Sequence, residues 1–154
     1  MKILFLLIAM LSAKTIAFDK TPLFDYVGYK CLVDNIYYEA RGESIQGQLA
    51  VAAVTINRKK PGQSLCDVVK APGQFSWVSK SRSKPTGLAL VTSQRVAGAA
   101  LGAWPGAGHG QLDFSKLPTK IQSAYFYHTK KVNPKWNKKM ARAGVIGNHI
   151  FYKG

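Results

Sequence analysis

The segment that follows Ser44 places the strongest constraint on the fold. Residues 45–58 are rich in alanine and valine, and apolar residues recur every three or four positions, the spacing of one helix face. Ser44 suits the N-cap of such a helix, and the run Lys-Lys-Pro-Gly at 59–62 ends the pattern. The segment therefore predicts a largely buried helix, against which the rest of the chain packs.

The only two glutamates of the chain, Glu39 and Glu43, come immediately before this helix. Apolar residues at 22–41 recur with helical spacing, and Gly42 suits the position just past a helix end, so Glu39 is expected in the last turn of a first helix. Flanked by the isoleucine and tyrosines of 36–38, its carboxyl group would lose hydration. That loss raises a pKa and prepares a general acid. The alternative is an exposed glutamate that pairs with Arg41 or caps the next helix.

The relation between the two carboxylates stays open at this point. Four-residue spacing would put Glu39 and Glu43 on one face of an unbroken helix, but Gly42 breaks the helix. Glu43 is therefore either a second catalytic carboxylate or a structural residue at the start of the second helix.

The rest of the chain predicts more helix and a small sheet. Residues 64–69 predict a capped helical turn, and residues 88–101 predict a third long helix closed by Gly102. A turn-rich stretch at 104–110 is a candidate wall or lid of a cleft. Two runs of β-branched and aromatic residues, 124–128 and 145–152, predict two strands. The fold class is therefore expected to be α+β and mainly α.

The length and the first residues indicate one exported domain. A chain of 154 residues is long enough for one compact domain and too short for two of ordinary size. A basic start, an apolar run at 3–11 and small residues at 15 and 17 form the pattern of a secretory signal peptide. We therefore expect residues 1–17 to be removed and residues 18–154 to form one domain in the periplasm, the cell wall or the medium.

The chain is strongly basic. Its formal net charge is +15, and removal of Lys2 and Lys14 with the signal peptide lowers it by two to +13. Such a charge favours a polyanionic partner: nucleic acid, an anionic membrane surface or an acid-bearing cell wall polymer. A solvated basic face without a dedicated partner is the alternative. No recognisable nucleic-acid-binding module is present in the sequence, so we do not expect nucleic acid.

The chain has two cysteines, Cys31 and Cys66. In an oxidising compartment two cysteines favour a single disulfide, here between the first helix and the segment after the second. The alternative is a catalytic thiolate with a histidine partner. His109, His128 and His149 are 19 and 21 positions apart and lack the paired spacing of zinc ligands. We therefore expect neither a metal nor another cofactor.

One aromatic segment is a candidate for binding sugars. Residues 73–77, Gly-Gln-Phe-Ser-Trp, follow a proline and combine aromatic rings with the amide of Gln74. Sugars stack on aromatic faces, and amides bind their hydroxyl groups. The alternative is that these rings belong to the ordinary core.

Several sequence blocks, taken in order, resemble one known family. The blocks are NIYYEARGE (35–43), GQLAVA (47–52), INR (56–58), CDVV (66–69), QFSW (74–77), FYH (126–128), PKW (134–136) and IGNHIFY (146–152). They resemble the SleB-type cell wall hydrolases, named for a spore cortex-lytic enzyme, and the resemblance covers residues 29–152. Some members carry a cysteine just before the QFSW block, where this chain has Gly73.

The resemblance implies a peptidoglycan-cleaving domain related to lytic transglycosylases and lysozyme, mostly helical with a small sheet beside the substrate groove. It also implies that Glu39 is the catalytic acid, acting on the bond between N-acetylmuramic acid and N-acetylglucosamine. We favour lytic transglycosylation, which needs one carboxylate, over a hydrolytic muramidase that also uses Glu43. Two different functions also stay open at this point, an N-acetylmuramoyl-L-alanine amidase and a non-catalytic cationic wall-binding protein.

The expected substrate contacts come from three parts of the chain. Gln74, Tyr127 and His128 are expected to bind substrate, and Trp77 and Trp136 to stack on sugars. We expect no separate wall-binding domain, so the positive charge of the chain would supply affinity for wall polymers or for a membrane surface. We expect it to act as a monomer on peptidoglycan.

Overall fold

The computed structural model describes residues 24–102 and 112–154. The predicted signal peptide, the stretch at 104–110 and His109 lie outside the described residues. Within them, no helix is long and apolar enough to cross a bilayer.

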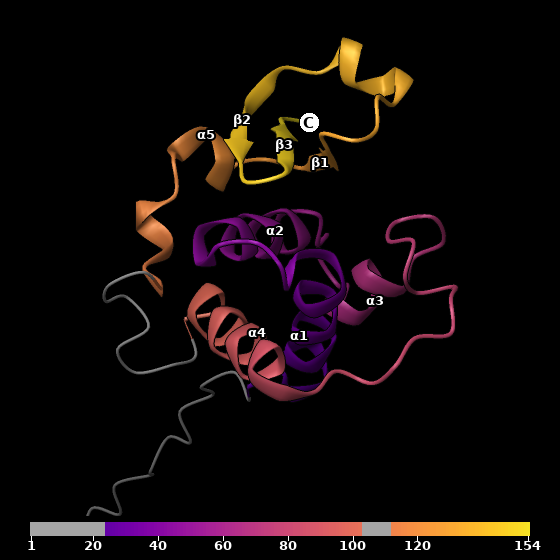
Figure 1. The fold of residues 1–154 in the computed structure, drawn as a ribbon, viewed down its shortest axis with the longest axis vertical. Coiled ribbons are helices and arrows are strands. Elements are labelled where there is room, and N and C mark those ends of the chain that lie inside the picture. The colour runs from indigo at the N-terminus through magenta and orange to yellow at the C-terminus, as the bar shows by residue number, and fades with distance from the viewer. Residues whose placement is uncertain (1–23, 103–111) are drawn as a thin grey trace, which may run out of the picture.

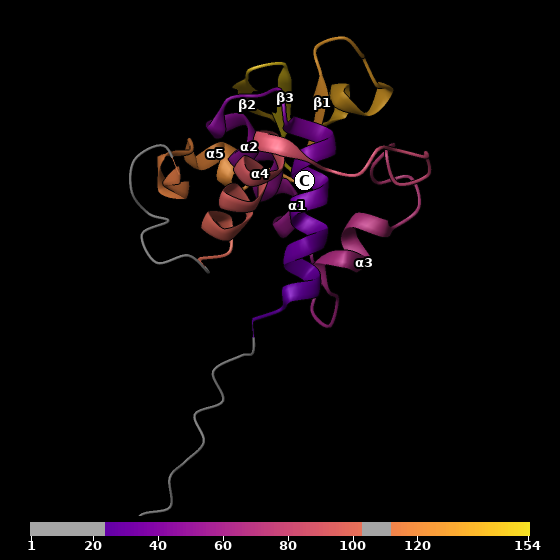
Figure 2. The same cartoon turned by 60° about the horizontal axis from the view of Figure 1, so that its bottom comes forward.

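Four helices form one layer of the molecule. They are α1 (Tyr26–Ala40), α2 (Ile45–Asn57), α3 (Leu65–Lys70) and α4 (Gly87–Ala100). The helix α1 lies between α3 and α4, and α2 crosses above them on the side of the sheet (Figures 1 and 2). As predicted, α2 is the centre of the core, since its residues from Gly47 to Thr55 are all buried.

Local capping explains where these helices begin. The Oδ1 of Asp25 accepts from the backbone N–H of Gly28, so α1 begins at Tyr26 rather than at the predicted residue 22. Ser44 caps α2 as predicted, its Oγ accepting from the N–H of Gly47. The predicted turn at 64–69 is α3, which begins with a capping box.

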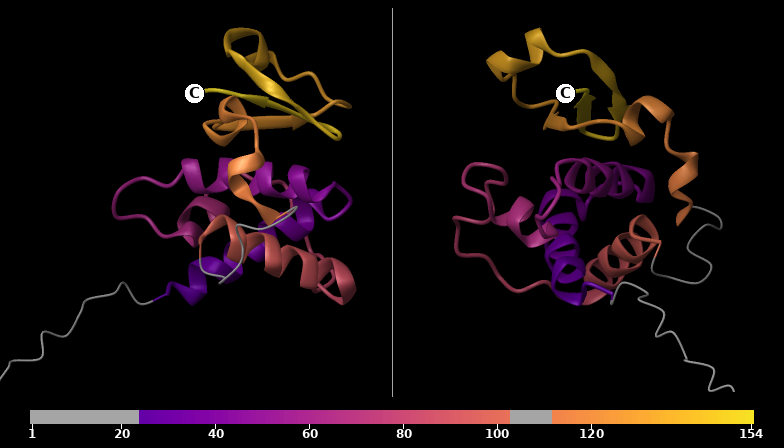
Figure 3. Two further views of the ribbon diagram at one scale, coloured as in Figure 1. Left: turned by 90° about the vertical axis from the view of Figure 1, so that its left-hand side faces the viewer. Right: turned by 180° about the vertical axis from the view of Figure 1, so that it is seen from behind.

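A small antiparallel sheet forms the second layer, above α2 (Figures 1 and 3). Its strands are β1 (Phe126–Thr129), β2 (Arg142–Ile146) and β3 (His149–Tyr152), in the order β1-β3-β2. The prediction of two strands was wrong in one respect, because the run at 145–152 is a hairpin. Gly147, with a φ of +54°, and Asn148 form the turn between β2 and β3.

Short elements connect the two layers. A 3₁₀ turn (Phe114–Lys116) and α5 (Thr119–Gln122) precede β1, and a second 3₁₀ segment (Lys135–Lys139) lies between β1 and β2. The side-chain Nδ2 of Asn57, the last residue of α2, donates to the carbonyls of Gln122 and Ala124. This contact ties the entry to the sheet to the end of the central helix.

The predicted disulfide between Cys31 and Cys66 is present and joins α1 to α3. It closes a separation of 35 residues. By the loop-entropy model such a closure contributes about 3–4 kcal/mol to the free energy of unfolding. Because Cys31 lies two turns before Glu39 in the same helix, the bridge also holds that helix against its neighbour.

Candidate active site

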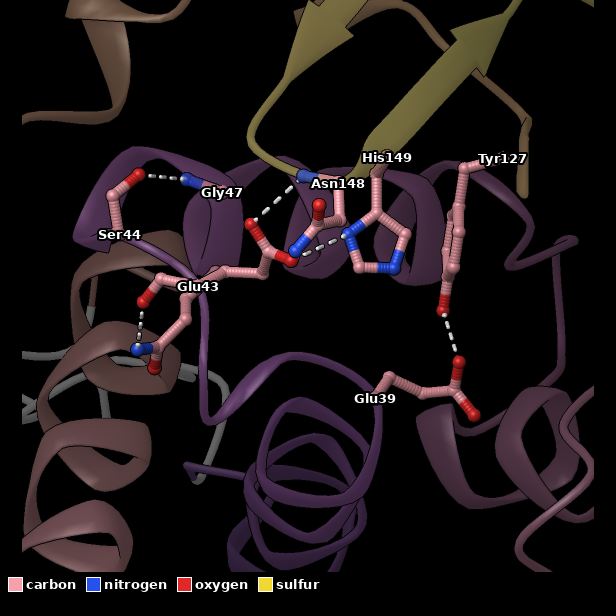
Figure 4. A network of polar contacts seen from close by, with 8 residues as sticks. Glu39, Glu43, Ser44, Gly47, Tyr127, Asn148 and His149 are labelled. Atoms are coloured by element: carbon pink, nitrogen blue, oxygen red, sulfur yellow. Dashed lines mark hydrogen bonds and ion pairs between the residues drawn. The ribbon is translucent and has the colours of Figure 1, made fainter. Parts of the chain in front are cut away.

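Glu39 lies in the last turn of α1, as predicted, with a partly buried side chain. Its Oε2 accepts a hydrogen bond from the hydroxyl of Tyr127 at 3.1 Å (Figure 4). Burial raises the pKa of Glu39 above its ordinary value, while the Tyr127 hydrogen bond and the charges of Arg58 and Arg82 oppose that rise. Glu39 therefore has the desolvated, partly compensated surroundings of a group that exchanges a proton.

Tyr127 reaches Glu39 from the sheet. It lies on β1, on the same face as its cross-strand neighbour Phe151, and its ring also meets His149 edge to face at 5.1 Å. Burial raises the pKa of the Tyr127 phenol well above its ordinary value, and the neighbouring Glu39 raises it further. The phenol therefore keeps its proton and acts as a hydrogen-bond donor to the carboxyl group.

Arg58 lies at the C-terminal end of α2. Of the two arginines whose charges lower the pKa of Glu39, it has the larger effect. Its Nε donates to the carbonyl of Tyr125 at 2.7 Å and its Nη1 to the Oε1 of Gln74 at 3.2 Å. The guanidinium also lies over the rings of Phe75 and Phe126, 5.4 and 5.5 Å from their centroids. Gln74, a predicted substrate contact, is thus joined to the site through Arg58.

Glu43 has different partners. Its Oε2 accepts from the backbone N–H of Asn148 at 3.2 Å, and its Oε1 lies 3.6 Å from the Nδ1 of His149. Figure 4 shows its carboxylate turned toward the β2–β3 turn, while that of Glu39 points to Tyr127. Burial lowers the pKa of His149, although Glu43 opposes that shift, so the ring is neutral near neutral pH and the contact is polar rather than a full ion pair.

Two glycines leave the space that the Glu43 side chain occupies. A Cβ on Gly47 would lie 2.9 Å from the Cβ of Glu43, and a Cβ on Gly147 would collide with its Oε2. Glu43 thus links the start of α2 to the β2–β3 turn. The side-chain Nε2 of Gln48 donates to the backbone carbonyl of Glu43 and fixes the connection between the two helices.

Trp77 lies beside α1, not beside Tyr127. Its ring stacks on that of Tyr38 with centroids 4.5 Å apart, and its Nε1 donates to the Oδ1 of Asn35 at 2.9 Å. Asn35 is fully buried and donates in turn to the Oγ1 of Thr55 on α2. This chain of hydrogen bonds fixes Trp77 next to the turn of α1 that carries Glu39.

His128 and Trp136 lie on the other face of the sheet. Successive strand residues point to opposite faces, so His128 faces away from the side on which Tyr127 meets Glu39. The Nδ1 of His128 donates to the carbonyl of Thr129, which leaves its Nε2 to accept from the hydroxyl of Tyr152. The ring stacks on Tyr152 and meets Trp136 edge to face. The structure therefore does not bring these two predicted contacts to Glu39.

Several residues of this site were not predicted from the sequence. Arg58 and Asn35 occur in the sequence blocks of the family resemblance without a role of their own, and Tyr38 is expected only as an aromatic neighbour of Glu39. The available signal for Asn35 was its place one turn before Glu39 on the face of the helix that carries Leu32 and Ile36, where an apolar residue would be expected. Over residues 24–102 and 112–154, no group of three histidine, cysteine or acidic side chains is placed to hold a metal ion.

Comparison with known proteins gives one family and two similar structures. The family model described as Cell Wall Hydrolase matches residues 42–152, starting just after Glu39. The catalytic domain of the Bacillus cereus SleB protein is 25% identical with a TM-score of 0.55, and the match covers 82% of this chain and 91% of that chain. The catalytic domain of the germination-specific lytic transglycosylase SleB from Bacillus anthracis is 23% identical with a TM-score of 0.60, covering 86% of this chain and 98% of that one.

The comparison with curated proteins finds no match. The two structural likenesses confirm the expected α+β, mainly helical fold with its small sheet. The family match spans most of the chain and confirms the resemblance drawn from the sequence blocks. This protein belongs to the cell wall hydrolase family and is an enzyme that degrades peptidoglycan.

Proposed function

We propose that the enzyme cleaves the β-1,4 bond between N-acetylmuramic acid and N-acetylglucosamine as a lytic transglycosylase. The observation that carries the proposal is the environment of Glu39, a partly buried carboxyl group with a raised pKa and a fixed donor, Tyr127. A related solved structure is described as a lytic transglycosylase, which supports the same reaction.

In the first step, protonated Glu39 donates its proton to the oxygen that bridges the two sugars. The bond from that oxygen to C1 of the muramic acid breaks, and its electron pair stays on the oxygen, so the N-acetylglucosamine leaves as an alcohol. C1 acquires oxocarbenium character in this transition state. Burial of Glu39 favours the protonated form that this step requires.

In the second step, ionised Glu39 accepts the proton of the 6-hydroxyl group on the same muramic acid. The freed oxygen attacks C1 and closes a 1,6-anhydro ring, which regenerates protonated Glu39 without consuming water. The hydroxyl of Tyr127 and the charge of Arg58 stabilise the carboxylate between the two steps. The site thus compensates a charge that exists only during the reaction.

The second glutamate supports the single-carboxylate route. Glu43 accepts from the backbone of Asn148 and lies against His149, with a side chain that is 10% exposed. A carboxylate held in this way serves the fold, so we assign Glu43 a structural role. A hydrolytic muramidase with two carboxylates would need the second one free on the opposite face of the sugar, either to activate water or to attack C1.

The proposed substrate contacts follow from the arrangement around Glu39. Tyr127 donates a hydrogen bond to Glu39, and Gln74 accepts one from Arg58. Trp77 offers an aromatic surface beside the end of α1. In this proposal the cluster of His128 and Trp136 supports the far face of the sheet. The positive charge of the chain adds affinity for acidic wall polymers, and the disulfide supports a location outside the cytosol.

The experiment is mass spectrometry of the fragments that the protein releases from purified peptidoglycan, with Glu39→Gln as the matched variant. We expect 1,6-anhydromuramic ends from the wild type and none from the variant. Reducing muramic ends would instead indicate a muramidase and would return Glu43 to the mechanism. Free peptides would indicate an amidase, and binding without any release would indicate a wall-binding protein.

A further inference from the structure

A pocket opens beside Arg58 at the C-terminal end of α2. It has a volume of about 500 Å³, which is within the range of pockets that bind small molecules. The end of α2, the loop before α3 and the start of β1 line it, and its walls include Arg58, Gln74 and the ring of Phe126. Glu39 is not part of its lining, and Arg58, whose charge acts on Glu39, is the residue that the pocket and the proposed catalytic site share.

The guanidinium of Arg58 is already positioned for an anion. Its contacts with the carbonyl of Tyr125 and the amide of Gln74 use two of its five N–H groups. The group also contacts the rings of Phe75 and Phe126, which restrict its movement. A fixed guanidinium with donors to spare suits two-point recognition of a carboxylate and loses little side-chain entropy when it binds.

The charges around the pocket favour the same ligand. Lys59 and Lys60 follow Arg58 directly and line the pocket with exposed side chains. The acid in the lining, Asp67, accepts from the backbone N–H and the hydroxyl of Ser64 in the capping box of α3. The pocket lining thus contains three cations and one carboxylate, and the carboxylate already accepts hydrogen bonds from Ser64. The lining therefore has a net positive charge.

The chemistry of the substrate identifies which part carries such an anion. In intact peptidoglycan the sugars of the glycan strand are uncharged, because the lactyl acid of the muramic residue is joined to the peptide through an amide. The free carboxylates belong to the peptide stem attached at that position. We propose that the Arg58 pocket binds a carboxylate of the peptide stem on the muramic residue at the cleavage site.

This inference rests on the proposed glycan cleavage, and the position of Arg58 connects the two. Arg58 lines the pocket, and its charge acts on Glu39. A stem held by Arg58 therefore places its muramic residue close to the acid. The pocket makes the enzyme selective for glycan that carries peptides with free carboxylates.

The test measures peptide binding apart from catalysis. Calorimetry with a free stem tetrapeptide, which contains no glycosidic bond, gives a dissociation constant for the wild type and for two variants. Arg58→Lys keeps the charge but loses the planar fork, and we expect about tenfold weaker binding. The double variant Lys59→Gln with Lys60→Gln leaves the contacts of Arg58 with Tyr125 and Gln74 in place, and we expect several-fold weaker binding.

A matched control separates the pocket from general charge. Lys138→Gln with Lys139→Gln removes two exposed lysines from the segment between β1 and β2, which is not part of the pocket. We expect this variant to bind the tetrapeptide like the wild type. Equal weakening in both double variants would overturn the proposal, as would tighter binding of glycerol phosphate than of the peptide, which would assign the pocket to phosphate-bearing wall polymers.

Cleavage assays then complete the test. Peptidoglycan whose peptide carboxylates have been converted to amides with carbodiimide and ammonia should be cleaved with a KM several-fold higher than the untreated material. An unchanged KM would overturn the proposed pocket. If neither material is cleaved while the tetrapeptide still binds at Arg58, the proposed glycan cleavage fails and the binding site stands.

Discussion

Glu39 and Glu43 are four residues apart, yet the structure gives them opposite surroundings. Glu39 ends a helix and meets a side-chain hydroxyl and the field of two arginines. Glu43 begins the connection to α2 and meets a backbone N–H and an imidazole of the β2–β3 hairpin. One carboxyl group has partners suited to a changing charge, and the other has partners that join two layers of the fold.

Spacing in the sequence alone does not assign a pair of catalytic carboxylates. The helix breaks after Ala40, so the two side chains leave the backbone toward different elements. The Glu39 side chain contacts Tyr127, and the Glu43 side chain contacts the turn at Gly147. Both contacts come from the sheet. The sheet therefore separates the surroundings of the two carboxylates, and four tests ask whether their proposed roles differ in the same way.

The largest expected effect is on catalysis at Glu39. Glu39→Gln keeps the shape of the side chain but removes the proton that the leaving oxygen needs. We expect kcat to fall about 10³-fold, the scale of a lost general acid. The melting temperature should not fall, because a neutral amide at a buried position costs less to desolvate than a carboxylate. An active Glu39→Gln enzyme would remove Glu39 from the mechanism.

Glu43→Gln is the matched variant on the other side of the comparison. The substitution removes a charge-assisted hydrogen bond to Asn148 and the contact with His149, so we expect about 1–2 kcal/mol less stability in denaturant unfolding. Product type should stay the same, with kcat lowered less than tenfold. A 10³-fold loss of kcat in a variant as stable as the wild type would show that Glu43 is catalytic and would contradict the structural role proposed for it.

The space around Glu43 can be tested through a glycine. Gly147→Ala places a Cβ against the Glu43 carboxylate, whereas Gly62, which also has a positive φ, faces open space. Both alanine variants carry the backbone strain of that conformation. We expect Gly147→Ala to lose about 1–2 kcal/mol more than Gly62→Ala.

A double-mutant cycle shows whether that extra loss comes from Glu43. In a Glu43→Ala background the collision is removed, so the two glycine variants should then differ little. If the difference persists, the hairpin turn itself is the cause, and Glu43 has no part in positioning it.

The helices could be predicted from the sequence because their signals are local. Ser44 and Ser64 lie within three residues of the N–H groups that they cap, so sequence and structure agree there. The third strand was missed although Gly147-Asn148 is a recognised two-residue hairpin signal. The β-branched and aromatic residues on both sides of that pair made the run look continuous.

The site could be predicted only in part. The aromatic surroundings of Glu39 follow from its own helix, but Arg58 acquires its role from Gln74, Tyr125 and two rings that distant segments contribute. Strand alternation was available and would have separated Tyr127 from His128, since neighbours on a strand cannot face one acid together. The partners of Glu43 depend on a hairpin that was not predicted from the sequence.

A smaller change is expected in the pKa of Glu39 when a nearby charge is removed. Arg82, an exposed residue of the loop before α4, lowers the pKa of Glu39 through its charge. Arg82→Gln removes that charge, so the pKa of Glu39 rises and the acid keeps its proton to higher pH. Because the first step of the proposed mechanism uses the protonated form, the alkaline limb of kcat/KM should move to higher pH, by an amount that shrinks as salt screens the wild-type charge.

Lys80→Gln, in the same exposed loop, is the control for that shift. It changes the net charge by the same amount, but Arg58 and Arg82 are the cations that act on Glu39. An equal movement of the limb in both variants would mean that the profile follows total charge rather than the local field. If only Arg82→Gln moves the alkaline limb, the protonation of Glu39 sets that limb. Glu43→Gln should then leave the alkaline limb at the wild-type pH.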